Sequence, residues 1–147
     1  MRVLLDTNVL LDSLLQRVPW HVEADAILRQ AKPQILELSV VALSLANLFY
    51  IGRRIVGTEQ ARADVRRVAQ TFNILAVDRS TILQADALPG ADFEDNIQIA
   101  AATNAMLTAI VTRDPTGFAA SPIPVWSPAE LLKQRAASTA PSAPTGE

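Results

Sequence analysis

The sequence predicts a three-layer α/β fold of the Rossmann-like type, with a central, mostly parallel sheet. Short runs of branched apolar residues alternate along the chain with segments of helical period. Half of the 147 residues are apolar, which is enough to bury one core of ordinary domain size. Strands that alternate with helices in this way are typical of parallel sheets that are covered by helices on both faces.

The first half of the chain opens with a strand that is expected at Arg2–Leu5, an apolar run that ends at Asp6. A helix over Asn8–Gln16 follows, because leucines recur there at helical spacing. Gly57 stands where a helix C-terminus favours glycine, and Thr58 is a plausible N-cap for the next helix. The further elements expected here are a helix over 22–33, a strand over 35–41, a helix over 44–55 and a helix over 58–72.

The second half continues the alternation and ends in a segment that has nothing to bury. Ser127-Pro128 is a typical opening for a last helix. From Ala136 the sequence is small, polar and proline-bearing, so we expect one domain over 1–135 and a disordered C-terminal tail over 136–147. The elements expected before the last helix are a strand over 74–77, a helix from 78, a helix over 92–106, and strands over 108–112 and 123–126.

Composition excludes several classes of protein. The chain has no cysteine, which rules out disulfide frameworks, thiolate zinc sites and cysteine nucleophiles and fits a reducing cytoplasm. Its first residues do not form a signal peptide, and no apolar run is long enough to span a membrane, so we expect a cytoplasmic protein. The net charge of −2 gives no indication of a nucleic-acid partner.

Carboxylates fall where an open parallel sheet builds its sites. Asp6 ends the first strand and Asp114 follows the 108–112 strand, and sites in such sheets form outside the carboxyl ends of strands. A third group, Asp92, Glu94 and Asp95, stands at the start of a helix. Clustered carboxylates without cysteine or a second histidine favour Mg²⁺ or Mn²⁺ over zinc.

Each carboxylate also has a purely structural interpretation. Asp92 is a good helix N-cap, and Glu94 is expected to be solvated beside the helix start. Asp6 could cap the helix that follows it, and Asp114 could be a turn residue before a proline. Asp95 is the most difficult to explain structurally, because it begins the apolar face of its helix.

Three segments resemble the motifs of one family in the family's own order. MRVLLDTNVLLD resembles the opening motif of PIN domains, the fold of many bacterial toxin–antitoxin ribonucleases. DFEDNIQIAAA resembles their third acidic motif, and AIVTRDPTGF followed by SPIPVWSPAELL resembles their closing motif. The resemblance spans about residues 1–132 and implies a Mg²⁺- or Mn²⁺-dependent endoribonuclease, the toxin of a toxin–antitoxin pair.

The resemblance also assigns roles to particular residues. It implies that Asp6, Asp95 and Asp114 are catalytic and hold the metal, with Asp92 as a nearby fourth ligand. It implies that Thr112 supports the site through its hydroxyl group. Asn8, in the opening motif, and Asn47 are two further residues that we expect to support the site.

Two positions depart from the family pattern. Many PIN nucleases carry a second acid early in the helix after the second strand, and here Asn47 stands in its place, in a stretch with no acid. Gly117 occupies a position that is often aspartate. The alternative function is therefore a catalytically weakened PIN-like module that binds RNA or a protein.

Positive charge gathers on the two helices between residues 44 and 72. Arg53 and Arg54 could contact RNA phosphates near the metal site, as could Arg113 beside Asp114, and the structural alternative is a solvated helix face. The helix that carries Phe49 is unusually apolar and would suit contact with an antitoxin or a second copy, so we expect a homodimer.

Other α/β chemistries fit the sequence poorly. A phosphatase of the haloacid dehalogenase type needs an aspartate where Asn8 stands, and there is no glycine-rich phosphate loop. A serine triad is unsupported because His21, the only histidine, has no plausible partners.

Overall fold

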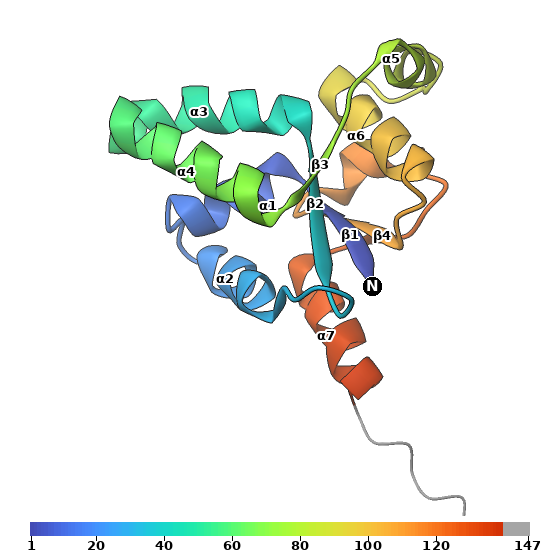
Figure 1. Ribbon diagram of the computed structural model, residues 1–147. Coiled ribbons are helices and arrows are strands. Elements are labelled where there is room, and N and C mark those ends of the chain that lie inside the picture. Colours follow the sequence, from blue (N-terminus) through green and yellow to red (C-terminus); the bar gives the residue numbers. More distant parts are fainter. Residues whose placement is uncertain (140–147) are drawn as a thin grey trace, which may run out of the picture.

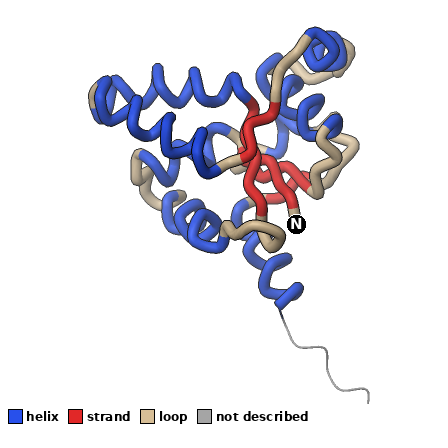
Figure 2. The backbone as a smooth tube through the Cα atoms, viewed as in Figure 1, coloured by secondary structure: helices blue, strands red, loops and turns tan. Residues whose placement is uncertain are grey.

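The computed structural model describes residues 1–139 and has a five-stranded sheet at its centre (Figures 1 and 2). The strands are β1 (Arg2–Leu5), β2 (Glu37–Val41), β3 (Asn73–Leu75), β4 (Ala109–Val111) and β5 (Val125–Trp126). All neighbouring strands in the sheet are parallel, in the order β3-β2-β1-β4-β5. The predicted α/β fold is therefore confirmed, and the sheet is wholly parallel.

Helices connect the strands and cover both faces of the sheet. They are α1 (Thr7–Leu14), α2 (His21–Gln30), α3 (Ala42–Val56), α4 (Thr58–Thr71), α5 (Arg79–Asp86), α6 (Phe93–Asn104) and α7 (Pro128–Thr139), with the 3₁₀ turn η1 (Pro115–Phe118). Within residues 1–139, no helix has the length and apolar character that a bilayer span requires.

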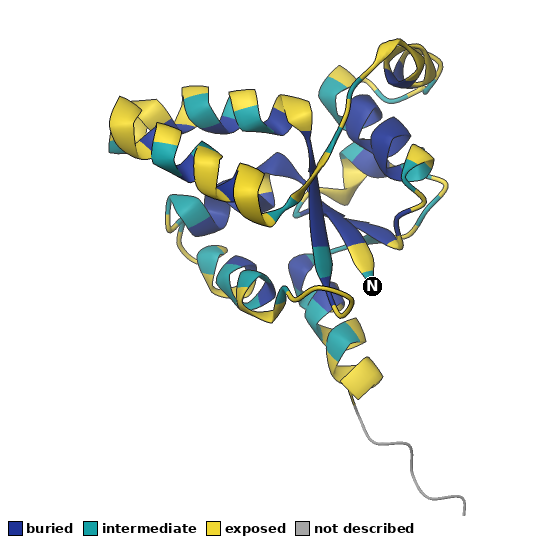
Figure 3. Ribbon diagram, viewed as in Figure 1, coloured by how far each residue is buried: buried dark blue, intermediate teal, exposed yellow. Residues whose placement is uncertain are grey.

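Alternation along β1 divides the core into two layers. Val3 and Leu5 pack into a cluster with residues of α1, α2, α3, α4 and α7, whereas Leu4 packs on the opposite face with residues of α6 and η1. All three side chains are fully buried. Figure 3 shows β1 and β2 mostly dark blue, between helices whose outer faces are largely yellow.

The sheet order reverses direction between two particular strands. The chain moves outward in one direction from β1 to β2 and β3, and then returns to add β4 and β5 on the other side of β1. In open parallel sheets, ligands bind in the crevice outside the carboxyl ends of the strands at such a reversal, which here are β1 and β4. Asp6 directly follows β1, and Thr112 directly follows β4.

Several predicted boundaries differ from the structure by one to three residues. Gly57, with φ of 85°, is the N-cap of α4, so Thr58 is the first helical residue rather than the cap. The strand expected over 108–112 is Ala109–Val111 in the structure, although Thr112 N still donates a hydrogen bond to Trp126 O of β5 at 3.0 Å. α7 continues to Thr139, so the expected boundary at 135 falls within a helix, and the rest of the predicted tail lies outside the described residues.

Candidate functional site

Asp6 stands at the crevice between β1 and β4, and its carboxylate is bound from two elements. Oδ2 accepts a hydrogen bond from Thr112 Oγ1 at 2.9 Å, and Oδ1 accepts one from Gln98 Nε2 of α6 at 3.2 Å. Asp6 is the N-cap residue of α1, but its side chain makes no capping hydrogen bond. The capping interpretation of its carboxylate is therefore wrong. The carboxylate is instead held across the crevice, and the residue is only 6% exposed.

Thr112 connects Asp6 to the segment that carries Asp114. Its Oγ1 donates to Asp6 and accepts a hydrogen bond from the Asp114 backbone N–H at 3.0 Å. The Asp114 side chain is the N-cap of η1, where Oδ1 accepts from Thr116 N at 3.2 Å. The turn role considered for Asp114 is thus present, and the residue is exposed at the same edge of the sheet.

The N-terminus of α6 brings the third acidic group to this edge. Asp92 is the N-cap of α6, and its Oδ1 accepts a hydrogen bond from Asp95 N at 3.1 Å, as the capping interpretation predicts. Gln98 lies one turn after Asp95 and is almost fully buried, so the hydrogen bond from Gln98 to Asp6 ties this helix face to β1.

Asp95 has the most perturbed environment of these carboxylates. Burial raises the pKa of Asp95 to about 6, and negative charges around it act in the same direction. The groups that add to the effect are, in decreasing order, Asp92, Asp6, Glu94 and Asp114. No ion pair in the described part of the chain involves any of these five carboxylates. The cluster therefore carries negative charge that no protein cation offsets within residues 1–139.

The donor set suits a hard cation, although the side chains do not form a coordination shell in this conformation. The nearby ligands are carboxylate oxygens, which Mg²⁺ and Mn²⁺ prefer. Among residues 1–139, no three or more His, Cys, Asp or Glu side chains are arranged to hold a metal ion. Thr112 and Gln98 hold the Asp6 carboxylate in this conformation. The residues fit such a cation by charge and by donor chemistry.

Glu94 is bound by the protein rather than solvated as the sequence suggested. Its Oε1 accepts a hydrogen bond from Asn47 Nδ2 of α3 at 2.7 Å, and Thr7 Oγ1 of α1 lies 3.3 Å from the same oxygen. Glu94 is half-buried. The expectation that Glu94 is solvated is wrong, because α1 and α3 approach the N-terminus of α6 at this point.

Known proteins identify the family. The sequence model described as "PIN domain" matches residues 2–116. The chain belongs to the PIN domain family. No curated protein matches it at the level of sequence.

Solved structures of toxin–antitoxin proteins share the fold of this PIN domain. A toxin–antitoxin complex from Klebsiella pneumoniae has a TM-score of 0.66 and 23% identity over 86% of this chain and 97% of that chain. FitAcB from Neisseria gonorrhoeae has a TM-score of 0.64 and 24% identity, with the same coverage. VapC20 from Mycobacterium tuberculosis, a toxin that cleaves the sarcin-ricin loop, has a TM-score of 0.67 and 15% identity over 80% of this chain and 94% of that chain.

The arginines that were predicted to contact substrate lie on α3 and in the loop after β4 of this PIN domain. Arg113 Nε and Nη2 contact the buried carboxylate of Asp12 at 2.5 and 3.1 Å, and its guanidinium group lies 4.1 Å from the Trp20 ring centroid. Arg53 and Arg54 occupy the last turn of α3. The six residues from Asn47 to Arg53 span about 9 Å of helix axis. Asp12 therefore holds Arg113, and contact of Arg53 and Arg54 with substrate stays a prediction.

Gly117 and Asn8 are the two remaining positions that the sequence singled out. The structure leaves no room for a side chain at Gly117, since an added Cβ would lie 2.0 Å from Asp95 Oδ2. Asn8 is exposed in the first turn of α1, and its side chain makes no hydrogen bond among the described residues.

Sequence reasoning missed Gln98 as a residue that holds the site together. It is a lone polar residue in the apolar run IQIAAA, three residues after Asp95. Helical spacing places the two on one face, which is the signal that could have found Gln98.

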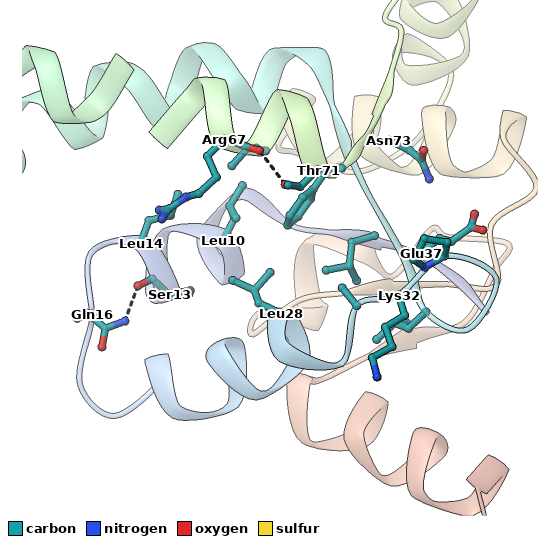
Figure 4. A pocket seen from close by; sticks show the side chains of 16 residues that line it. Leu10, Ser13, Leu14, Gln16, Leu28, Lys32, Glu37, Arg67, Thr71 and Asn73 are labelled. Atoms are coloured by element: carbon teal, nitrogen blue, oxygen red, sulfur yellow. Dashed lines mark hydrogen bonds between the residues drawn. The ribbon is translucent and has the colours of Figure 1, made fainter. Parts of the chain in front are cut away.

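A separate hollow of about 890 Å³ lies on the other side of α1, between α2, β2 and α4 (Figure 4). Leucines of α1 and α2 line it, with Lys32, Glu37 and Arg67 among the polar side chains around it. None of the clustered carboxylates lines this hollow. It is therefore distinct from the candidate metal site.

Proposed function

We propose that this PIN domain is a divalent-metal-dependent endoribonuclease and the toxin of a toxin–antitoxin pair. The observation that supports it most is the crowding of carboxylates around Asp95 at the carboxyl ends of β1 and β4, without a protein cation among the described residues. Uncompensated crowding of this kind is unfavourable unless a cation offsets it. The match to the PIN domain model is a second observation that supports the proposal.

The residues that would hold Mg²⁺ or Mn²⁺ are Asp6, Asp95 and Asp114, with Asp92 beside them. A cation bound there supplies a lowered pKa for a coordinated water and offsets charge on the phosphoryl oxygens of RNA. Thr112 and Gln98 fix the orientation of the Asp6 carboxylate, so little rearrangement is needed at that ligand.

RNA as substrate and an antitoxin as partner follow from the structural neighbours rather than from a binding surface. Several of these neighbours are toxin–antitoxin complexes, and one is a toxin that cleaves RNA. A cytoplasmic location is part of the same proposal, because RNA is the proposed substrate. The exposed apolar side chains of α3, which include Tyr50 and Ile55, support contact with a partner protein, and a homodimer remains a prediction.

The test of this function is RNA cleavage by the purified chain with added Mn²⁺ or Mg²⁺. We expect cleavage that stops on chelation and that is lost in Asp6→Asn and Asp95→Asn, because each substitution removes a charged ligand without changing side-chain size. Cleavage that survives chelation, or survives both substitutions, would refute the proposal.

The alternative is a catalytically weakened relative, and the amide at Asn47 is the observation that favours it. An amide brings no charge to a cation and accepts no proton. Asn47→Glu distinguishes the two possibilities. If the wild-type protein does not cleave RNA and Asn47→Glu does, the catalytically weakened relative is favoured. A wild-type protein that already cleaves RNA would favour the endoribonuclease.

A further inference from the structure

Asn47 supplies a hydrogen-bond donor at the position where many PIN nucleases carry an acid. Its Nδ2 donates to Glu94 Oε1 at 2.7 Å, across 47 residues of sequence. An amide that donates to a carboxylate fixes the position of that carboxylate. The side of the site next to α3 therefore presents a carboxylate from α6 instead of one from α3.

A second contact orients the same oxygen of Glu94. Thr7 Oγ1 lies 3.3 Å from Glu94 Oε1 and 2.7 Å from Ser44 Oγ. Because a hydroxyl group has one proton, both contacts are satisfied when Ser44 donates to Thr7 and Thr7 donates to Glu94. Ser44 is fully buried and Thr7 nearly so, which fixes these donors in place.

Both contacts fall on Oε1, and among residues 1–139 no hydrogen bond reaches Oε2 of Glu94. A carboxylate held by one oxygen keeps the other available to a ligand. Glu94 is also near enough to Asp95 for its charge to act on that residue. Glu94 and Asp95 therefore both add negative charge at the N-terminus of α6.

The simpler explanation for Glu94 is a favourable interaction with the positive end of α6. That explanation applies equally to Glu59, which occupies the corresponding second position of α4 and is exposed. It does not account for the donors that α1 and α3 direct at Glu94. These contacts join three elements at one half-buried carboxylate.

We propose that Glu94 is a metal ligand that replaces the acid missing at position 47, and that Asn47 is its positioning residue. This inference rests on the proposed function, because it assigns a further ligand to the same cation. It also explains the departure at Asn47. The carboxylate that many PIN nucleases carry on α3 is supplied here by Glu94 of α6, and Asn47 donates a hydrogen bond to it.

The test is Mn²⁺ binding to the full chain, measured by isothermal titration calorimetry, with Glu94→Gln, Asn47→Ala and Asp95→Asn compared with wild type. We expect Glu94→Gln and Asn47→Ala each to weaken Mn²⁺ binding by about tenfold to a hundredfold. Glu59→Gln is the matched control and should bind as wild type does. Circular dichroism and thermal melting show whether each variant is folded.

The double variant Asn47→Glu/Glu94→Gln reverses the pair, since the amide then donates from α6 to a carboxylate on α3. We expect it to recover most of the Mn²⁺ affinity that Glu94→Gln loses. A merely structural role for the hydrogen bond would not predict this recovery, because Glu94→Gln already keeps two polar side chains in contact.

The outcomes separate this inference from the proposed function. If Asp95→Asn loses Mn²⁺ binding while Glu94→Gln binds as wild type does, the proposed function stands and Glu94 is not a ligand. If folded wild-type protein binds no Mn²⁺, both are wrong. Loss in Glu94→Gln without recovery in the double variant would overturn the exchange of the acid between the two positions.

Discussion

At position 117 the absence of a side chain makes room for the carboxylate of Asp95. A Cβ built on Gly117 would lie 2.0 Å from Asp95 Oδ2, which is closer than real Cβ atoms approach, and 3.0 Å from its Cγ, which is a tight contact. Any larger residue here must displace Asp95. The departure from the aspartate that PIN domains often carry at this position is thus linked to where Asp95 lies.

Gly117→Ala should therefore weaken Mn²⁺ binding by about tenfold, as expected when a ligand loses its orientation. Calorimetric titration measures the effect, and Gly52→Ala is the control because its added Cβ would meet the Ala61 Cβ at an ordinary 3.7 Å. Equal affinity in the two alanine variants would show that Asp95 does not need this space.

Individual residues were predicted well where neighbouring sequence determines their role. Asp92 is a helix N-cap because the chain enters α6 directly after it. The Glu94 contacts could not be predicted, since Asn47 and Thr7 are far away in the sequence. The contact between Arg113 and Asp12 could not be predicted either, because 101 residues separate the two in the sequence.

Among the elements, α6 begins with Asp92 as its N-cap, and the acids that follow Asp92 carry the proposed metal-binding chemistry. Asp92→Ala removes the acceptor for Asp95 N and should lower the free energy of unfolding by about 1 kcal/mol. Asp92→Asn keeps a capping oxygen and should change stability little. Urea unfolding compares the two variants, and an equal loss of stability in both would contradict a capping role.

α1 and the loop after β4 are connected by the ion pair between Asp12 and Arg113. Asp12 is 1% exposed, and Arg17 lies 3.7 Å from its Oδ1 as a second cation. Arg113→Ala should lower the free energy of unfolding by about 3 kcal/mol, because it removes a partner of a buried charge. Urea unfolding measures the loss.

Arg54→Ala is the matched control for Arg113→Ala. Arg54 is exposed and forms no ion pair within the described residues, so its loss should change stability by less than about 0.5 kcal/mol. A stable Arg113→Ala variant that only binds RNA less tightly would instead support the substrate-contact role predicted from the sequence.

Element types were predictable from periodicity, whereas several ends were not. The strand over 108–112 is shorter by one residue at each end in the structure, and the Thr112 hydroxyl group beyond it contacts Asp6 and Asp114. α7 extends to Thr139, since small residues such as Ala136 and Ala137 are compatible with a helix even where they bury little.

For the whole molecule, the raised pKa of Asp95 links the site to stability. In the metal-free protein the folded state holds the Asp95 proton up to about pH 6, whereas an unfolded aspartate loses it near its ordinary value. Stability from this group is therefore present below about pH 4 and is lost as pH rises through about 6. Ionised Asp95 thus destabilises the metal-free fold at neutral pH.

Asp95→Asn should consequently raise the melting temperature of the metal-free protein at pH 7.5, and the gain should vanish near pH 4.5. Thermal melts in the presence of a chelator measure both values. Mn²⁺ should reverse the order at pH 7.5, because a ligand that binds only the folded state stabilises it. A variant that melts at the wild-type temperature under metal-free conditions at pH 7.5 would contradict the crowding of charge around Asp95.

The position of the site followed from the sheet as a whole. Asp6 and Asp114 were expected at one edge because parallel strands end there, and the reversal between β1 and β4 places both beside the same crevice. The order of the strands was not predictable from sequence, because it depends on the direction in which each crossover returns.

The most direct test of the metal site is a titration with Mn²⁺ followed by electron paramagnetic resonance at pH 7.5, with wild-type protein and Asp95→Asn side by side. We predict that the signal of free Mn²⁺ is depleted by the wild-type protein and not by the variant. Equal depletion by both proteins, or depletion by neither, would contradict a metal site built around Asp95.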